Sequence, residues 1–215
     1  MTRKRLALIA LLVVSLAGAL TVGTWAATRA SGRPGGAVNG PGHGMMGGGM
    51  MGGYGLAGNG QRVTSLNAAR ARAQAFADSL GLRTGEVIQF SNGFYATLLT
   101  AERAGATEVL IDLTNGGVGV EYGPAMMWNT SYGMHAAGVA RPMRVSAADA
   151  TRLAQRWLDG QRRGLTAGEP EQFPGYYTME TLRDGKIAGM MSVHRYTGAV
   201  FYHTWHGSFV AASEE

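Results

Sequence analysis

Five side chains that could bind a soft metal ion lie close together in a glycine-rich stretch of the sequence. They are His43, Met45, Met46, Met50 and Met51. Thioether and imidazole groups suit Cu(I), and they bind without the thiolates that a chain lacking cysteine cannot offer. The pattern predicts a Cu(I) site. The alternative is a low-complexity glycine and methionine tether with no ligand of its own, close to a membrane surface.

A second concentration of methionine and aromatic residues lies between residues 121 and 135. The candidate ligand or interface residues in it are Met126, Met127, Trp128, Met134 and His135. They could form a binding surface, or they could form a hydrophobic plug between two parts of the fold. Methionine fills irregular gaps well, and this favours the plug.

Two histidines near the end of the sequence, His203 and His206, could chelate an ion together with His194. On a regular strand, residues three apart point to opposite faces, so this site would require a bend. Histidines at sheet edges without a functional role are the simpler interpretation.

The sequence offers little for catalysis. Asp112 and His194 could act as acid and base only if two parts of the chain face each other, and Glu169 and Glu171 have the character of solvated loop charges. No motif of a zinc protease, a nucleophile elbow, a phosphate-binding loop or a dinucleotide-binding loop occurs in a suitable context. We expect no enzymatic activity and no catalytic residues.

The elements that must position these groups come in two similar sets. The first helix is predicted from Ser65 to Leu80, because apolar residues recur there at spacings of three and four. The second is predicted to begin at Ser146, with Asp149 forming a capping box. The predicted strands are 86–90, 94–101, 108–113 and 118–122 in the first set, and 176–182, 188–194 and 199–205 in the second, with a hairpin turn at Asp184 and Gly185. The predicted fold class is α+β, with one helix packed on a small antiparallel sheet in each set.

The two sets are also related by sequence. A single shift of 82 residues pairs Val63 with Val145, Tyr95 with Tyr177, and Gly116 with Gly198. Such a shift, without gaps, indicates two tandem repeats of one unit. It places Phe76 and Leu158 at equivalent positions, and we expect both to be buried.

The repeated pattern resembles the PepSY module. It consists of residues 64–68 (Thr-Ser-Leu-Asn-Ala), Tyr95 and the turn at 112–118, and it recurs at residues 146–150, Tyr177 and 194–200. The second copy departs from it by having His194 where the first has Asp112. The resemblance implies an extracytoplasmic or membrane-associated module that binds or restrains a partner, as in peptidase propeptides, with no catalytic residues.

The start of the sequence predicts export. The basic residues Arg3, Lys4 and Arg5 precede an apolar stretch from Leu6 to about Ala27, and about 20 apolar residues span a bilayer as a helix. The basic cluster stays on the cytoplasmic side, which places the rest outside. A cleaved signal peptide is the alternative to an uncleaved anchor. Localisation is therefore predicted as the cell membrane, single-pass with an extracytoplasmic domain, or exported if the leader is cleaved.

The predicted organisation has five parts. They are an N-terminal transmembrane anchor or signal peptide (1–30), a Gly/Met-rich flexible linker (31–61), a first PepSY-like repeat (62–123), a Met/Trp-rich loop (124–144) and a second PepSY-like repeat (145–207). Glycine makes ordering of the linker entropically costly. The net charge of +5 resides in the leader and in dispersed arginines, so nucleic acid is not expected as a partner.

Together these features predict a non-enzymatic, membrane-tethered, extracytoplasmic PepSY-like module without a cofactor. Its expected partner is another envelope protein or a peptidase. The alternative is an envelope protein that binds copper or silver through the methionine-rich linker. A hydrolase is the weakest of the three.

The soft-metal hypothesis can be tested on a peptide spanning residues 40–55. We expect it to bind Ag(I) in preference to Zn²⁺, because four thioethers and one imidazole surround a backbone that can wrap freely. Replacing its four methionines by leucine should abolish the binding. NMR titration checks this, and unchanged spectra of the wild-type peptide on addition of Ag(I) would leave the segment as a tether only.

Overall fold

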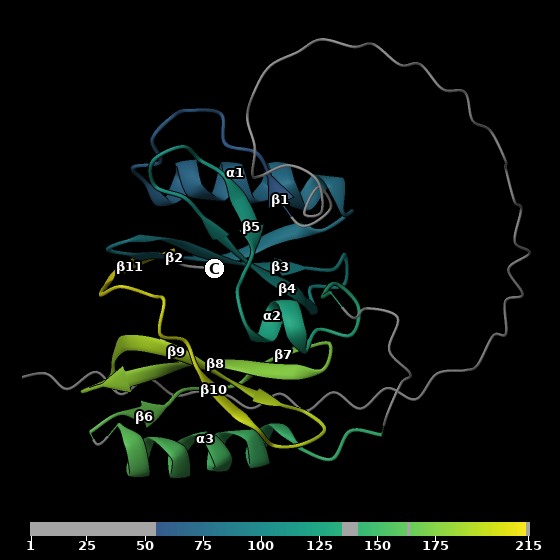
Figure 1. Ribbon diagram of the computed structural model, residues 1–215, viewed down its shortest axis with the longest axis vertical. Coiled ribbons are helices and arrows are strands. Elements are labelled where there is room, and N and C mark those ends of the chain that lie inside the picture. Colours follow the sequence, from purple (N-terminus) through teal and green to yellow (C-terminus); the bar gives the residue numbers. More distant parts are fainter. Residues whose placement is uncertain (1–54, 135–141, 163, 214–215) are drawn as a thin grey trace, which may run out of the picture. The chain divides into compact units, whose positions relative to one another are not determined.

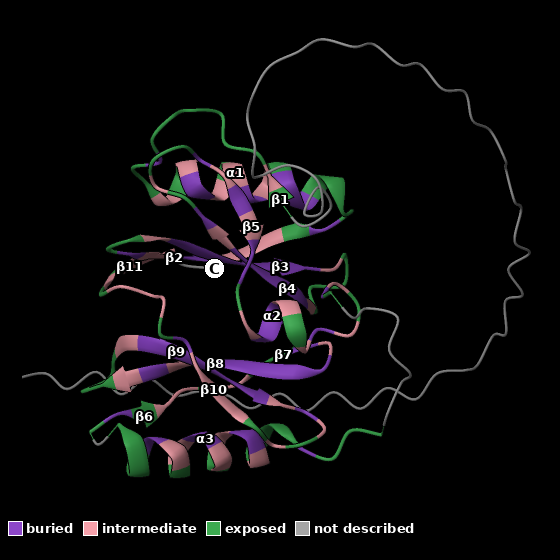
Figure 2. Ribbon diagram, viewed as in Figure 1, coloured by how far each residue is buried: buried purple, intermediate pink, exposed green. Residues whose placement is uncertain are grey.

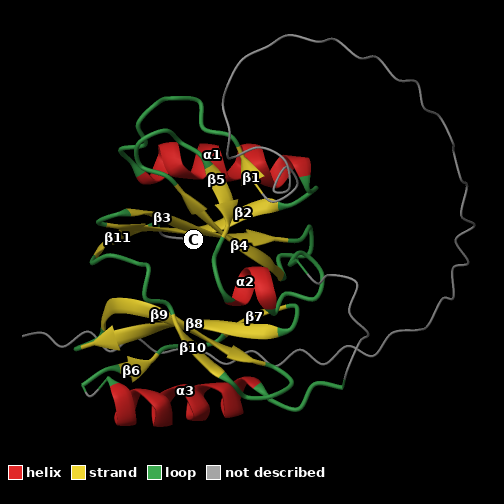
Figure 3. Ribbon diagram, viewed as in Figure 1, coloured by secondary structure: helices red, strands yellow, loops and turns green. Residues whose placement is uncertain are grey.

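Two helix-and-sheet layers make up the part of the chain that the computed structural model describes, which is residues 55–134, 142–162 and 164–213. The first sheet consists, in spatial order, of β1 (Gly55–Leu56), β5 (Val118–Val120), β4 (Gly105–Ile111), β3 (Gly93–Leu99), β2 (Arg83–Phe90) and β11 (Phe209–Ala212). The second consists of β10 (Val200–Tyr202), β9 (Lys186–His194), β8 (Tyr176–Arg183) and β6 (Thr166–Ala167), and β7 (Glu171–Phe173) also pairs with β8. The strand pairings described are antiparallel, which confirms the α+β class (Figure 3).

Each sheet carries one long helix on the face that points away from the other sheet (Figure 1). These helices are α1 (Leu66–Ser79) and α3 (Ala147–Gln161), and the short helix α2 (Pro124–Met127) follows β5. The predicted leader and most of the predicted linker lie outside the described residues. Within the described residues, no helix is long and apolar enough to cross a membrane.

Both long helices begin at a serine cap, as predicted. The Ser65 hydroxyl accepts from the amide of Ala68, which satisfies one free donor of the first turn of α1. Ser146 forms the predicted capping box with Asp149, whose carboxylate accepts in return from the Ser146 amide.

One glutamine ties each helix to the strand that follows it. Gln74 accepts from the amide of Thr84 at 2.9 Å, and Gln155 accepts from the amide of Ala167 at 2.9 Å. Each glutamine also donates to the aspartate four residues further along its own helix. The same local sequence therefore produces the same local contacts in both helix-and-sheet layers.

The contacts of the two helices correspond at a shift of 81 residues, because Ser65 and Ser146 are both caps and Gln74 and Gln155 make the same bonds. The turns after β4 and β9 correspond at a shift of 82. There the Gly116 amide donates to the backbone carbonyl of Asp112 at 3.0 Å, and the Gly198 amide donates to that of His194 at 2.9 Å. Both turn glycines have positive φ, a region that side chains with a Cβ rarely adopt. The predicted single shift of 82 residues therefore holds for these turns, whereas the helices correspond at a shift of 81.

Phe76 and Leu158 are both buried, as predicted. At the shift of 81, however, Leu158 corresponds to Ala77 rather than to Phe76. Each belongs to the apolar core under its own helix, the first with strands β2 to β5 and the second with β8 and β9. Figure 2 shows buried stretches along the strands of both sheets and exposed residues on the outward sides of α1 and α3.

A third apolar cluster joins the two sheets. Ile88, Phe90 and Tyr95 from the first sheet pack with Met190 from the second, and the half-buried Phe209 packs against them. Phe209 begins β11, which lies after the predicted end of the second repeat at residue 207. The chain therefore returns to its first sheet, where β11 pairs with β2.

Several short elements differ from the prediction. Gly55 and Leu56 fall within the predicted linker but form β1, which pairs with β5. The predicted loop between the repeats contains α2, and the second sheet has β6 and β7 in addition to the three expected strands. These strands have only two or three residues, too few for a pattern of alternation to mark them. The hairpin turn at Asp184 and Gly185 is confirmed, with positive φ at both residues.

If β11 holds the two sheets together, truncating its inward side chain should lower the stability of the whole domain. We expect Phe209→Ala to lower the free energy of unfolding by about 2 kcal/mol, somewhat less than a fully buried Phe→Ala costs. Val210→Ala is the matched control, because Val210 lies next to it and is 53% exposed. That variant should change stability by less than about 0.5 kcal/mol. Urea denaturation measures both, and equal effects would contradict this role of β11.

Candidate functional site

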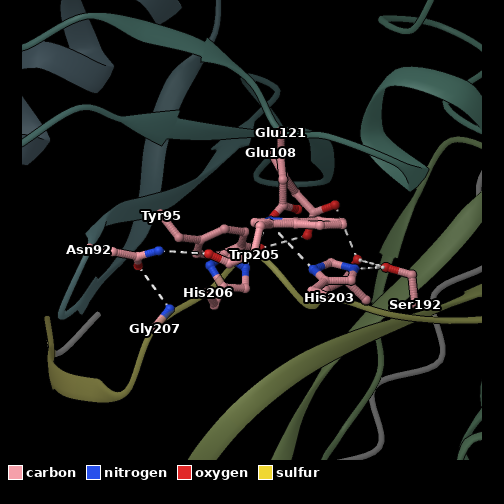
Figure 4. A network of polar contacts seen from close by, with 10 residues as sticks. Asn92, Tyr95, Glu108, Glu121, Ser192, His203, Trp205, His206 and Gly207 are labelled. Atoms are coloured by element: carbon pink, nitrogen blue, oxygen red, sulfur yellow. Dashed lines mark hydrogen bonds and ion pairs between the residues drawn. The ribbon is translucent and has the colours of Figure 1, made fainter.

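Two polar residues lie at equivalent places just after the last strand of each sheet motif. Glu121 follows β5 and its amide donates to the Glu108 carbonyl at 2.8 Å. His203 follows β10 and its amide donates to the Met190 carbonyl at 3.0 Å. Both side chains point into the space between the two sheets, where they meet (Figure 4).

The loop after β10 brings a second histidine to the same place. The strand ends at Tyr202, and the following residues bend back toward the β2–β3 turn. There the Asn92 side chain donates to the Trp205 carbonyl at 2.7 Å and accepts from the Gly207 amide at 2.8 Å. This clamp supplies the bend that the sequence could not reveal, and it places His206 beside Glu121 (Figure 4).

The three side chains form a tight cluster, which we call the Glu121 cluster: Glu121, His203 and His206. Oε1 of Glu121 lies 2.8 Å from Nε2 of His206 and 3.4 Å from Nδ1 of His203. Trp205 donates its indole N–H to the same oxygen at 3.1 Å. The side chains of Glu121 and His203 are fully buried and that of His206 is 4% exposed. Two imidazoles and a carboxylate in this arrangement are a donor set that could hold a metal ion.

Ring stacking fixes both imidazoles. His206 stacks on Phe90 with ring centroids 4.2 Å apart, and His203 stacks on Trp205 at 4.7 Å. The ring planes are therefore set by neighbours on the first sheet and on the loop itself.

A chain of hydroxyl groups connects the Glu121 cluster to a second buried acid, Glu108 in β4. Nε2 of His203 lies 2.9 Å from the Ser192 hydroxyl, which lies 2.8 Å from the Thr178 hydroxyl. Thr178 donates to Glu108 at 3.1 Å, and Tyr95 donates to its other oxygen at 2.6 Å. This series of hydrogen bonds runs from the second sheet to the first, so it adds a polar link between the two sheets.

The two buried glutamates differ in charge. Burial raises the pKa of Glu108 well above its usual value, and the negative charge of Glu121 raises it further. Burial also acts to raise the pKa of Glu121, but the charges of His203 and His206 outweigh this and lower it to about 2. The surroundings therefore favour the protonated form of Glu108 and the ionised form of Glu121.

Beside the Glu121 cluster lies a groove of about 470 Å³, bounded by β1, β5, β4, the β2–β3 turn and the loop after β10. Trp205 and His206 form one wall, so the cluster borders the groove directly. Gly58, Gly93, Gly117 and Gly119 leave much of the rest to backbone. Other lining residues are Leu56, Asn92, Leu110, Asp112, Asn115 and Tyr122.

The two methionine-rich sites predicted from the sequence contribute no described residue to the Glu121 cluster. His43, Met45, Met46, Met50, Met51 and His135 fall outside the described residues. Met126 and Trp128 pack against the first core, as a plug would, whereas Met127 and Met134 are 47% and 52% exposed. Among the described residues of this set, Met126, Met127, Trp128 and Met134 do not border the groove.

The predicted histidine site is partly corrected. His203 and His206 do converge, but His194 hydrogen-bonds Thr197 in its own turn and contacts the ring of Trp128. Asp112 likewise accepts from Thr114 in its own turn, so the structure does not bring Asp112 and His194 together as an acid–base pair. The third member of the cluster is Glu121. A signal for it was present, since the shift of 82 residues pairs Glu121 with His203.

Comparison with known proteins adds little. No family model matches the chain, and no curated protein matches it. A solved structure with some similarity is the Bacillus megaterium YpeB C-terminal domain, at 16% sequence identity and a TM-score of 0.26. The match covers 66% of this chain and 62% of that one. At this level of similarity it does not identify the fold or the function.

The raised pKa of Glu108 makes stability depend on pH. The folded state keeps this proton at pH values where the unfolded glutamate, with a pKa near 4.5, has lost it. Stability therefore falls as pH rises above about 4.5, by at most about 1.4 kcal/mol per pH unit. Glu108→Gln removes the proton and should flatten this decline between pH 5 and 8. The lowered pKa of Glu121 acts only below that window, where its contribution to stability is lost as pH falls toward 2.

Urea denaturation at several pH values, with a chelator present, measures the difference between wild type and Glu108→Gln. Glu169→Gln is the matched control, because Glu169 is an exposed glutamate. Its profile should run parallel to that of the wild type. A Glu108→Gln profile that is also parallel would show that Glu108 is ionised in the folded state.

Proposed function

We propose that this protein is a non-enzymatic, extracytoplasmic binding module, tethered to the membrane, that holds an extended segment of another envelope protein or of a peptidase. The groove beside Trp205 and Tyr122 is the observation that carries this proposal. Its volume of about 470 Å³ falls within the range of ordinary ligand sites.

The surface of the groove suits a polypeptide. Its glycines lack side chains, so another main chain can approach the floor closely, and Asn92 and Asn115 place amide groups at its rim. Tyr122 is 58% exposed and meets Trp205 edge to face, with centroids 6.0 Å apart. Exposed aromatic pairs of this kind are frequent anchors at interfaces.

The negative charge of Asp112 indicates which kind of polypeptide segment the groove favours. Asp112 borders the groove, and hydrogen bonds from Thr114 lower its pKa, so it is ionised at neutral pH. Among the described lining residues no arginine or lysine opposes it. An apolar or aromatic segment with a basic side chain therefore fits the groove better than an acidic one.

A tandem PepSY-like origin is supported by matching contacts in the two parts of the fold. The glutamine bridges of Gln74 and Gln155 correspond, as do the turns at Gly116 and Gly198. Duplication followed by divergence accounts for their different polar residues, since Glu121 in one copy corresponds to His203 in the other.

The absence of catalysis is part of the proposal. Glu108 and Glu121 are fully buried and bound to protein partners. An acid or base must reach a substrate, and neither side chain is exposed to one.

Site-specific crosslinking tests this function in cells that express the full chain. A photoreactive amino acid at Asn115, an exposed groove residue, should give discrete adducts with one envelope protein. The additional change Tyr122→Ala should reduce their yield strongly, because loss of an aromatic anchor costs about 2 kcal/mol, roughly thirtyfold in affinity.

Met143→Ala is the matched control, since Met143 is also 58% exposed and does not border the groove. It should leave the adducts unchanged. Equal adduct yields in the Tyr122→Ala and Met143→Ala backgrounds, or no adducts from position 115, would rule out binding in the groove.

A further inference from the structure

We infer that Glu121, His203 and His206 form a binding site for a divalent transition-metal ion of the Zn²⁺ type. The inference rests on the Glu121 cluster itself and not on the groove as a polypeptide site. It is also separate from the predicted Cu(I) site, because its three ligands differ in kind and in place from the thioethers of residues 45–51.

The spacing of the donor atoms fits one ion. In a tetrahedral zinc site, ligands at about 2.0–2.1 Å from the metal lie roughly 3.3 Å from each other. The separations from Oε1 of Glu121 to the two imidazole nitrogens, 2.8 and 3.4 Å, lie on either side of that value. All three ligand atoms fall within 4.8 Å of one another.

The two imidazole nitrogens and the second oxygen of Glu121 lack hydrogen-bond partners among the described residues. Nδ1 of His203, Nε2 of His206 and Oε2 of Glu121 are buried and none makes a hydrogen bond in the described part of the chain. The two nitrogens are close to the carboxylate, but their N–H directions are not aligned with it as a hydrogen bond requires. Buried polar atoms are nearly always satisfied, and one ion bound between these three atoms would satisfy them together.

Hydrogen bonds around His203 orient its ring as a metal ligand would require. Its Nε2 lies 2.9 Å from the Ser192 hydroxyl, and in the tautomer in which Nε2 donates to Ser192 the lone pair of Nδ1 faces Glu121. Metal-binding histidines almost always use the other ring nitrogen in this way. Thr178 and Glu108 continue the chain behind Ser192, so the ring has a complete outer support.

Charge balance points in the same direction. Glu121 is a fully buried carboxylate, and within the described residues its ion-pair contacts are with His203 and His206 alone. An isolated buried carboxylate is very costly unless a cation or hydrogen-bond donors compensate it. A divalent cation would supply the opposing charge. The competing arrangement is a plain ion pair with protonated histidine.

The donor set selects the class of metal. Two imidazole nitrogens and one carboxylate oxygen suit Zn²⁺, Co²⁺ and Cu²⁺, whereas Ca²⁺ and Mg²⁺ prefer oxygen alone. Three protein ligands leave a tetrahedral ion with one open position. Because His206 also borders the groove, an ion held here would lie behind the groove wall.

The test uses the full-length protein, purified in detergent, stripped of metal and titrated with Co²⁺. We expect one equivalent to bind with the visible absorption of tetrahedral Co²⁺, to be displaced by Zn²⁺, and to raise the unfolding midpoint. Glu121→Gln and His206→Gln should each weaken binding at least about a hundredfold, more than loss of an outer-shell partner does. His43→Ala is the control for the methionine-rich segment and should bind as the wild type does.

Ser192→Ala provides a second measure that does not remove a ligand. It should weaken Co²⁺ binding about tenfold to a hundredfold while circular dichroism stays unchanged. This variant decides the question if Glu121→Gln fails to fold. Wild-type protein without a Co²⁺ spectrum, or Co²⁺ binding that Glu121→Gln, His206→Gln and Ser192→Ala all leave unchanged, would overturn the inference and leave the cluster as an ion pair.

Discussion

The carboxylate of Glu121 is the group on which the arrangement of this protein depends. It is buried between two sheets, where a charge is tolerated only if its surroundings compensate it. Its partners come from one loop, which supplies His203, Trp205 and His206. That loop must therefore leave β10 at Tyr202 and turn toward the first sheet. The apolar contact between the sheets buries surface, but the Glu121 carboxylate determines which residues of the two sheets lie together.

Glu108 has the opposite character at almost the same depth. Two hydroxyl groups donate to it, and the nearby charge of Glu121 favours its protonated form. Such pairs of acids, pushed apart in pKa by their environments, are common in functional sites. Here Glu108 ends the series of hydroxyl hydrogen bonds, through Thr178 and Ser192, that supports His203. The two glutamates thus have separate tasks, one carrying charge and one orienting a neighbour.

The sequence predicted well what depends on local chemistry. Serine caps, helical spacing and the turns at Gly116, Gly198 and Asp184 each follow from a few adjacent residues, and all were found. The site was harder, because Glu121, His203 and His206 meet through a bend stabilised by Asn92, far away in the chain. Alternation on a strand even argued against the pairing of the two histidines. The return of β11 was missed for a related reason, since four consecutive apolar residues without alternation carry no signal of the strand they will join.

The position of β11 has a consequence for how the chain can fold. The Val87 amide donates to the Ser213 hydroxyl across 126 residues, and β2 has no neighbour on this side until those residues exist. Closing so long a loop is entropically costly and slow compared with forming a hairpin. During synthesis the first sheet must therefore wait with one edge open while the second sheet and α3 are made. An open edge can pair with other chains, so a nascent copy of this protein is exposed to misassembly until its last strand arrives.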